Sequence, residues 1–102
     1  MWKFKTPGIP DEEFERAEKV PITKEEVRVI QLSKARLKPG QIVYDIGCGS
    51  GSISIEAALQ IESSGKVLAV DYDKNAIELT KKNIAKFDLS NISVIYGNAK
   101  EK

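Results

Sequence analysis

The chain has 102 residues, of which 30% are charged, and a formal net charge of +1. This length allows one domain at most, and the small charge excludes a broad electrostatic grip on nucleic acid or membrane. One cysteine and no histidine exclude an internal disulfide and a Cys/His metal site, so no metal is expected. The apolar runs are too short to span a membrane and no secretory signal is recognisable, which predicts a cytoplasmic protein.

The N-terminal fifth of the chain is predicted to be largely irregular. Residues 1–22 contain three of the four prolines, and proline lacks the backbone donor that helices and sheets use. A short helical turn with its acidic residues first is expected at 11–19, with Phe14 as its only apolar anchor. The remaining residues, 23–102, form the predicted α/β domain.

A helix is predicted to open this domain. Thr23 and Glu26 have the spacing of a capping box, in which Thr23 accepts the N–H of Glu26 and Glu26 bonds back. Pro39 and Gly40 are expected to end the helix. Helical spacing predicts the face that packs inward, which comprises Val27, Val29, Ile30, Leu32, Lys34 and Leu37.

Strands and helices then alternate along the chain. The hydrophobic patterns predict a strand at 41–46, a glycine-rich loop at 47–51, a helix at 52–61, a strand at 66–70, a helix capped by Asp73 that ends near 87, and a strand at 92–96. The first strand is apolar at nearly every position, which is typical of a sheet covered on both faces. Right-handed crossovers then predict a parallel sheet with the strand order 3-2-1 and flanking helices.

The loop after the first strand is rich in glycine and flanked by acids. Gly47, Gly49 and Gly51 alternate with other residues. Asp45 lies two positions before the first glycine, and Asp71 ends the second strand. This layout is typical of sites for nucleotide-type cofactors. The glycines would let a cofactor reach the backbone N–H groups, and Asp71 could accept hydrogen bonds from ribose hydroxyls.

The position of Asp45 bears on the kind of cofactor. A carboxylate there would repel the pyrophosphate of NAD or FAD, and Ser52 stands where the dinucleotide fingerprint has its third glycine. It would suit a cationic ligand, such as the amino group of a nucleoside that carries an amino acid. The segment resembles the signature of class I methyltransferases, which use S-adenosylmethionine. A glycine turn that only joins strand to helix would not account for both carboxylates.

The first strand would have no partner on its outer edge. An apolar edge at 42–46 is an aggregation liability, and no further helices would cover the far side of the sheet. Two explanations compete: the chain is the N-terminal portion of a longer protein, truncated after the third strand, or another copy of the chain covers the edge. The charged ending at 100–102 favours truncation, and pairing of two copies remains a hypothesis.

Three blocks carry a more specific resemblance. Residues 8–14 (GIPDEEF) and 21–28 (PITKEEVR), together with the loop at 45–51 (DIGCGSG), resemble the decarboxylating cobalt-precorrin-6B methyltransferases of cobalamin biosynthesis. The resemblance implies the N-terminal half of a Rossmann-like class I methyltransferase fold that binds S-adenosylmethionine. It implies methylation of carbon 15 of a tetrapyrrole ring, with loss of carbon dioxide from an acetate side chain. It also implies a homo-oligomer, commonly a tetramer.

The resemblance further implies which residues bind the cofactor. The loop backbone would pass the methionine part, Asp71 would hold the ribose, Tyr72 would lie beside the adenine, and Thr23 would belong to an entrance segment. The residues expected at the cofactor are Thr23, Asp45, Gly47, Cys48, Gly49, Ser50, Gly51, Asp71, Tyr72, Asn98 and Ala99. Asn98 stands where such enzymes often carry aspartate.

Several of these residues also have a plainer interpretation. Asp71 could be a turn aspartate, Asp45 could orient the loop through backbone hydrogen bonds, and Thr23 could be only a helix cap. Cys48 is expected to be a small buried residue, because nothing basic nearby would activate its thiol. No residue is nominated as catalytic, since methyl transfer needs mainly alignment of the reacting atoms.

Two other functions stay open at this point. The chain could be a non-catalytic cofactor-binding fragment, which its short length favours. It could also be a class I methyltransferase with another small-molecule, RNA or protein substrate, against which the block at 8–14 and the predicted cap at Thr23 argue. Neither nucleic acid nor membrane is an expected partner, because the net charge is so small.

Overall fold

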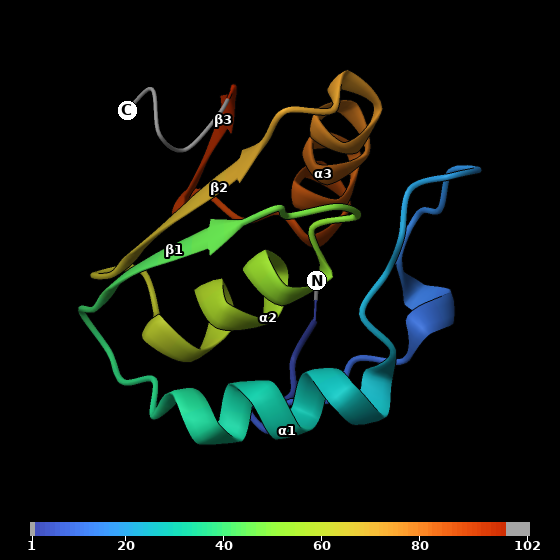
Figure 1. Ribbon diagram of the computed structural model, residues 1–102. Helices are drawn as coiled ribbons and strands as arrows, with labels where there is room; N and C mark the ends of the chain where they lie inside the picture. Colours follow the sequence, from blue (N-terminus) through green and yellow to red (C-terminus); the bar gives the residue numbers. More distant parts are fainter. Residues whose placement is uncertain (1, 98–102) are drawn as a thin grey trace.

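The structure, a computed structural model, describes residues 2–97 and contains a three-stranded sheet with helices packed against it (Figure 1). Its elements are η1 (Asp11–Glu13), α1 (Glu25–Ala35), β1 (Ile42–Ile46), α2 (Ser52–Ile61), β2 (Lys66–Asp71), α3 (Lys74–Phe87) and β3 (Ile92–Tyr96). The strands neighbour one another in the order β1, β2, β3, and both pairs are parallel. The predicted α/β class and strand order are confirmed.

The helices lie on one face of the sheet (Figure 1). The hydrophobic core lies between the sheet and these helices. Right-handed crossovers that add strands in one direction place their helices on the same side. Val43, Val67 and Ile92 are in register across the three strands and point toward this side. They pack there with the helical residues Leu32, Ala57, Ala58 and Ile61.

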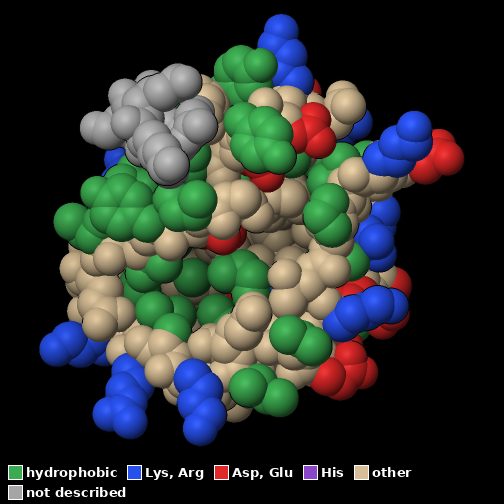
Figure 2. All heavy atoms as spheres, viewed as in Figure 1, with side chains coloured by type: hydrophobic (Ala, Val, Ile, Leu, Met, Phe, Trp, Pro, Cys, Tyr) green, Lys and Arg blue, Asp and Glu red, His purple; other side chains and the backbone are tan. Residues whose placement is uncertain are grey.

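The other face of the sheet is open at β1. Successive side chains of a strand point to opposite faces, so an almost wholly apolar strand places half of its side chains there. Ile42, Tyr44 and Ile46 are 67%, 66% and 58% exposed, and Figure 2 shows hydrophobic side chains gathered on the face of the molecule in view. Among residues 2–97 no strand pairs with the outer edge of β1, as the sequence predicted.

The start of α1 differs from the prediction. The helix begins at Glu25 after Lys24, and no side chain at this N-cap position bonds to the first turn. The expected capping box of Thr23 and Glu26 is therefore wrong. Its place is taken by a residue far away in sequence, because the Asp11 carboxylate accepts the Glu25 N–H at 3.3 Å.

The buried face of α1 also differs from the prediction. Arg28 and Leu32 are its buried residues, whereas Val27 and Ile30 are 50% and 61% exposed. The predicted face is therefore wrong for Val27 and Ile30, whereas Leu32 is buried and Leu37 packs against the core, as predicted. The physical reason is that Arg28 forms ion pairs with acids of other segments, and these turn it inward and rotate the apolar stripe outward.

The remaining elements follow the sequence closely. Helix α2 has the predicted bounds, and the Asp73 carboxylate caps α3 by accepting the Asn75 N–H at 2.9 Å. Before α1, the described residues contain only the short η1 turn, and Phe14 is buried against Phe87 with 5.2 Å between ring centroids. Over the part of the chain that the structure describes, no helix is both long and apolar enough to cross a membrane.

Candidate functional site

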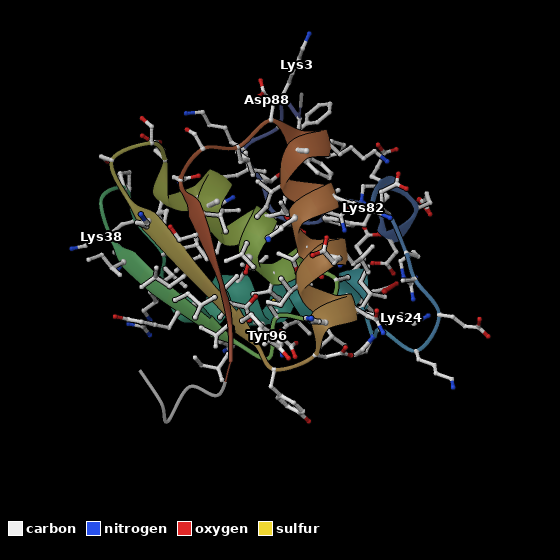
Figure 3. The ribbon with its side chains drawn as sticks, turned by 90° about the horizontal axis from the view of Figure 1, so that it is seen from above. Lys3, Lys24, Lys38, Lys82, Asp88 and Tyr96 are labelled. Carbon is white, nitrogen blue, oxygen red and sulfur yellow. The ribbon has the colours of Figure 1, made fainter. Side chains whose placement is uncertain are left out.

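The glycine-rich loop, residues 47–51, lies at the carboxyl ends of β1 and β2, beside a groove. The groove has a volume of about 520 Å³ and is lined by Pro21, Gly47, Asp71, Tyr72, Asp73, Lys74 and Ala76. Figure 3 shows Tyr96 at this carboxyl end of the sheet and Lys38, which precedes β1, toward the opposite end. Ligands of open parallel sheets bind at the carboxyl ends of the strands, so the groove is the candidate site.

The loop is held by hydrogen bonds from its own N–H groups. Gly47 and Cys48 both donate to the Val70 carbonyl, at 2.7 and 3.0 Å. The remaining donors also have partners: Gly49 donates to Asp71 at 3.0 Å, Ser50 to Pro21 at 3.2 Å and Gly51 to Cys48 at 2.9 Å. The expectation that a cofactor would reach these N–H groups is therefore wrong, because the protein itself uses them. A ligand in the groove would meet the loop at Gly47, the loop residue that lines the groove.

The first two glycines serve different purposes. Gly49 has φ of +56°, and a Cβ on it would lie 2.9 Å from the Pro21 carbonyl oxygen, so a side chain there collides with protein. Gly47 has φ of +75°, yet a Cβ on it would meet nothing within 4 Å. Gly49 is thus required by packing, whereas the space beside Gly47 opens into the groove and is free for a ligand.

Asp71 lies between the loop and the groove and is only 9% exposed. Its Oδ2 accepts the Gly49 N–H at 3.0 Å, and its Oδ1 accepts the Asp73 N–H at 2.9 Å. The plainer role of a turn aspartate is therefore observed. A carboxylate has about four lone-pair positions, so this arrangement leaves acceptor capacity toward the groove.

Asp45 is on β1, on the same face of the sheet as Asp71 of the neighbouring strand. It accepts the Ser54 hydroxyl at 2.6 Å, which ties the strand to the first turn of α2. Burial raises the pKa of Asp45, the Ser54 hydrogen bond opposes that rise, and the negative charge of Asp71 adds to it. Among residues 2–97, no recorded ion pair involves either carboxylate.

A lysine also borders the groove without pairing with these acids. Lys74 is exposed, and its ammonium lies 6.0 Å from the centroid of the Tyr96 ring, within cation–π range. The groove therefore combines the Asp71 carboxylate, which repels the nearby Asp45, with the open space beside Gly47. A cationic group in the groove would relieve that repulsion.

Two polar residues of α3 donate hydrogen bonds to carbonyl groups of the loop. The sequence analysis did not predict this role for them. Thr80 donates to the Gly49 carbonyl at 2.9 Å, and Asn83 donates to the Ser50 carbonyl at 2.8 Å. Both are fully buried. The signal that could have found them is a pair of polar residues three apart on the inward face of an amphipathic helix.

Cys48 has the structural role expected of it. It is 7% exposed, and its sulfur lies 3.3 Å from the Thr80 hydroxyl oxygen. Burial raises the pKa of its thiol to about 11, so at neutral pH the residue is a protonated thiol rather than a nucleophile.

The other predicted residues lie at different distances from the groove. Tyr72 is 79% exposed and lines it, whereas Ser50 and Gly51 are buried in the loop. Thr23 is half-buried and is not among the lining residues; it offers its carbonyl to Arg28. The entrance-segment residue that lines the groove is Pro21, which sequence reasoning did not single out. Asn98 and Ala99 lie outside the described residues.

Comparison with known proteins adds relatives to this geometry. The family described as precorrin methyltransferase domain matches residues 12–102. A protein of Sulfurisphaera tokodaii named "Probable cobalt-precorrin-6B C(15)-methyltransferase (decarboxylating)" is 57% identical over 96% of this chain and 51% of its own length. A protein of the same name from Methanocaldococcus jannaschii is 47% identical over 91% of this chain and 49% of its own length.

Solved structures give a consistent result. The crystal structure titled precorrin-6y C5,15-methyltransferase from Geobacter metallireducens superposes with a TM-score of 0.86 at 36% identity, over 96% of this chain and 51% of that one. A precorrin 8W decarboxylase from Methanobacterium thermoautotrophicum has a TM-score of 0.83 at 32% identity, over 91% and 50%. The chain spans about half the length of the relatives it matches. It belongs to the precorrin methyltransferase family.

Proposed function

We propose that this chain forms the S-adenosylmethionine-binding half of a decarboxylating cobalt-precorrin-6B C15-methyltransferase of cobalamin biosynthesis. Family membership and the names of the relatives support the reaction and the precorrin substrate. One observation in this chain supports the cofactor. Asp71 lines the groove, its negative charge acts on the nearby Asp45, and neither carboxylate has an ion-pair partner in residues 2–97.

The residues present fit this cofactor. The space beside Gly47, which a Cβ would occupy, leaves room for the methionine part along the loop. The free acceptor positions of Asp71 suit the ribose hydroxyls, and Asp45 suits the amino group, because a carboxylate strengthens each hydrogen bond that it accepts. Tyr72 would lie beside the adenine. Asn98 and Ala99 stay predicted at the adenine edge, and Thr23 stays predicted as a neighbour in the entrance segment.

The chain's own contribution to the reaction is positioning. Bound S-adenosylmethionine supplies a methyl group activated on a sulfonium, and alignment with a carbon nucleophile can lower the barrier by about 7–11 kcal/mol. The described residues of the groove include no histidine and no low-pKa thiol. We therefore assign no catalytic residue to them.

Calorimetry with S-adenosylhomocysteine tests the cofactor assignment. We expect the chain to bind it, and we expect Asp71→Asn to weaken binding by about 1.5–3 kcal/mol, or about 10- to 150-fold, because a charged hydrogen bond is lost. Asp88→Asn is the matched control, since Asp88 follows α3 at the end of the helix far from the groove (Figure 3). Equal affinities for the wild type and Asp71→Asn would remove the ribose assignment.

We also propose that the protein acts as a homo-oligomer, as the resemblance implies. The exposed apolar side chains of Ile42, Tyr44 and Ile46 and the unpaired edge of β1 support self-association. Size-exclusion chromatography with light scattering should show a mass above that of one chain. A monomer at high concentration would contradict this. A cytoplasmic location stays a prediction.

A further inference from the structure

A buried guanidinium gathers several distant segments of the chain. Arg28 is fully buried, and its Nε donates to the Glu56 carboxylate at 2.7 Å. Its Nη1 donates to Asp11 at 3.0 Å and to the Thr23 carbonyl at 2.6 Å. Its Nη2 donates to the Ile9 carbonyl. One side chain of α1 therefore bonds to α2, to the segment at 9–11 and to the residues just before its own helix.

Glu56 completes this arrangement from α2. Its two carboxylate oxygens accept the N–H groups of Gly8 and Ile9, at 2.8 and 3.0 Å, in addition to the Arg28 bond. Glu56 is 2% exposed. Because both side chains are buried, water cannot solvate their charges, and the ion pair compensates them instead. Together the two residues hold the backbone of the N-terminal segment.

Two routes lead from this pair to the glycine loop, and both end at Ser50. On one side, Arg28 holds the Thr23 carbonyl, and two residues earlier the Pro21 carbonyl accepts the Ser50 N–H. On the other side, Arg28 lies over the Phe14 ring at 5.0 Å. The backbone N–H of the next residue, Glu15, donates to the Asn83 side-chain oxygen, and the Asn83 side-chain amide donates to the Glu15 carbonyl. Asn83 in turn donates to the Ser50 carbonyl.

We propose that Arg28, through its ion pair with Glu56, is a positioning residue for the cofactor site. The pair keeps residues 21–23 against the loop, so that the Ser50 peptide is held on both sides and Gly47 faces the groove. The inference rests on the proposed function for the identity of the ligand. It goes beyond that function because Arg28 itself is not among the residues lining the groove.

The test uses two variants that perturb the pair differently. Arg28→Lys keeps the charge but loses the fork of donors that reaches several acceptors at once. Arg28→Met combined with Glu56→Gln removes both charges, which avoids leaving one buried ion without its partner. Lys86→Met is the matched control, because it removes an exposed ion pair to Glu15 in the same N-terminal segment.

Two readouts separate positioning from general stability. Hydrogen exchange of the Ser50 amide should accelerate at least tenfold in both pair variants, while the Val67 amide, bonded to Asn91 at the far end of β2, keeps its rate. Calorimetry should show S-adenosylhomocysteine bound at least tenfold more weakly by both. The Lys86→Met control should match the wild type in each measurement.

Distinct results overturn the two proposals. A folded pair variant with wild-type Ser50 exchange and wild-type affinity would overturn the positioning role. Equal acceleration at Ser50 and Val67 would also overturn it, since that pattern means a merely structural pair. If the wild-type chain fails to bind S-adenosylhomocysteine, the proposed cofactor fails, while the exchange measurement still decides whether Arg28 positions the loop.

Discussion

Two groups of inward-facing charges in this small protein have opposite arrangements. Around Arg28, the acids Glu56 and Asp11 meet a guanidinium whose three nitrogens all donate hydrogen bonds, so the charges compensate one another. At the carboxyl ends of β1 and β2, Asp45 and Asp71 have only hydroxyl and amide donors, and burial together with the charge of Asp71 raises the pKa of Asp45.

The first group has the features of a structural ion pair, whereas the second has those of a binding site. A buried ion whose hydrogen-bonding groups are all satisfied within the chain has nothing left to offer a ligand. Burial and the negative charge of Asp71 raise the pKa of Asp45. A perturbed carboxyl group without a cationic partner remains available to a cationic ligand, which is the pattern expected of a functional site.

The largest effect is expected from breaking the compensated group. Arg28→Met alone leaves the Glu56 carboxylate buried without its charged partner, which should lower the free energy of unfolding by about 3–5 kcal/mol. Denaturant unfolding followed by circular dichroism measures this. Lys86→Met, which removes a half-exposed pair, should cost no more than about 0.2–1 kcal/mol. Similar losses in the two variants would mean that the buried ion pair contributes no more to the free energy of unfolding than the exposed one.

A smaller loss is expected where the loop is packed against Pro21. Gly49→Ala places a methyl group against the Pro21 carbonyl at a residue with φ of +56°, so it should lower the free energy of unfolding by about 1–3 kcal/mol. Gly47→Ala should be less costly, because its Cβ meets no atom within 4 Å. It should instead weaken S-adenosylhomocysteine binding by filling the groove. A Gly47→Ala variant that binds S-adenosylhomocysteine as tightly as the wild type would contradict the claim that the space beside Gly47, unlike that beside Gly49, is open to a ligand.

The support beneath the loop predicts a modest effect. Thr80→Val preserves shape but removes the hydroxyl that donates to the Gly49 carbonyl, and one net hydrogen bond is worth about 1 kcal/mol. The same substitution at Thr23 should change the free energy of unfolding by less than about 0.5 kcal/mol, because its side chain does not cap α1. A large loss in Thr23→Val would restore the capping box that the structure contradicts.

The smallest effect, with the opposite sign, is expected at the uncompensated pair. The folded state raises the pKa of Asp45 above its ordinary value of 3.8, so it holds the proton more tightly than the unfolded state. Wild-type stability therefore falls as the pH rises from about 3.8 through the raised pKa. Asp45→Asn keeps an acceptor for Ser54 and removes this fall, so it should be more stable at pH 7. Thermal unfolding at several pH values would show the prediction to be wrong if the variant lost stability at neutral pH.

Much of the fold could be predicted because it depends on local patterns. The bounds of α2 and β3, the Asp73 cap and the parallel strand order follow from hydrophobic periodicity, a capping residue and the handedness of crossovers. The position of the glycine loop and of Asp71 beside the groove follows from the same topology.

The errors arise where a distant residue replaces a local partner. The Thr23 cap failed because Asp11 bonds to the start of α1, and the predicted face of α1 failed because acids of other segments turn Arg28 inward. Nothing in the sequence within one turn of either residue indicates these partners.

The sequence by itself thus determined the order of elements, the proposal that a ligand binds at the carboxyl ends of the strands, and the family to which the chain belongs. Only the tertiary structure decided that the loop's N–H groups are already bonded, that Pro21 rather than Thr23 lines the groove, and that Arg28 connects the N-terminal segment to the rest. The reason is physical. Periodicity and turn chemistry act between neighbours in the chain, whereas hydrogen-bond and charge compensation act between any groups that folding brings within about 3 Å.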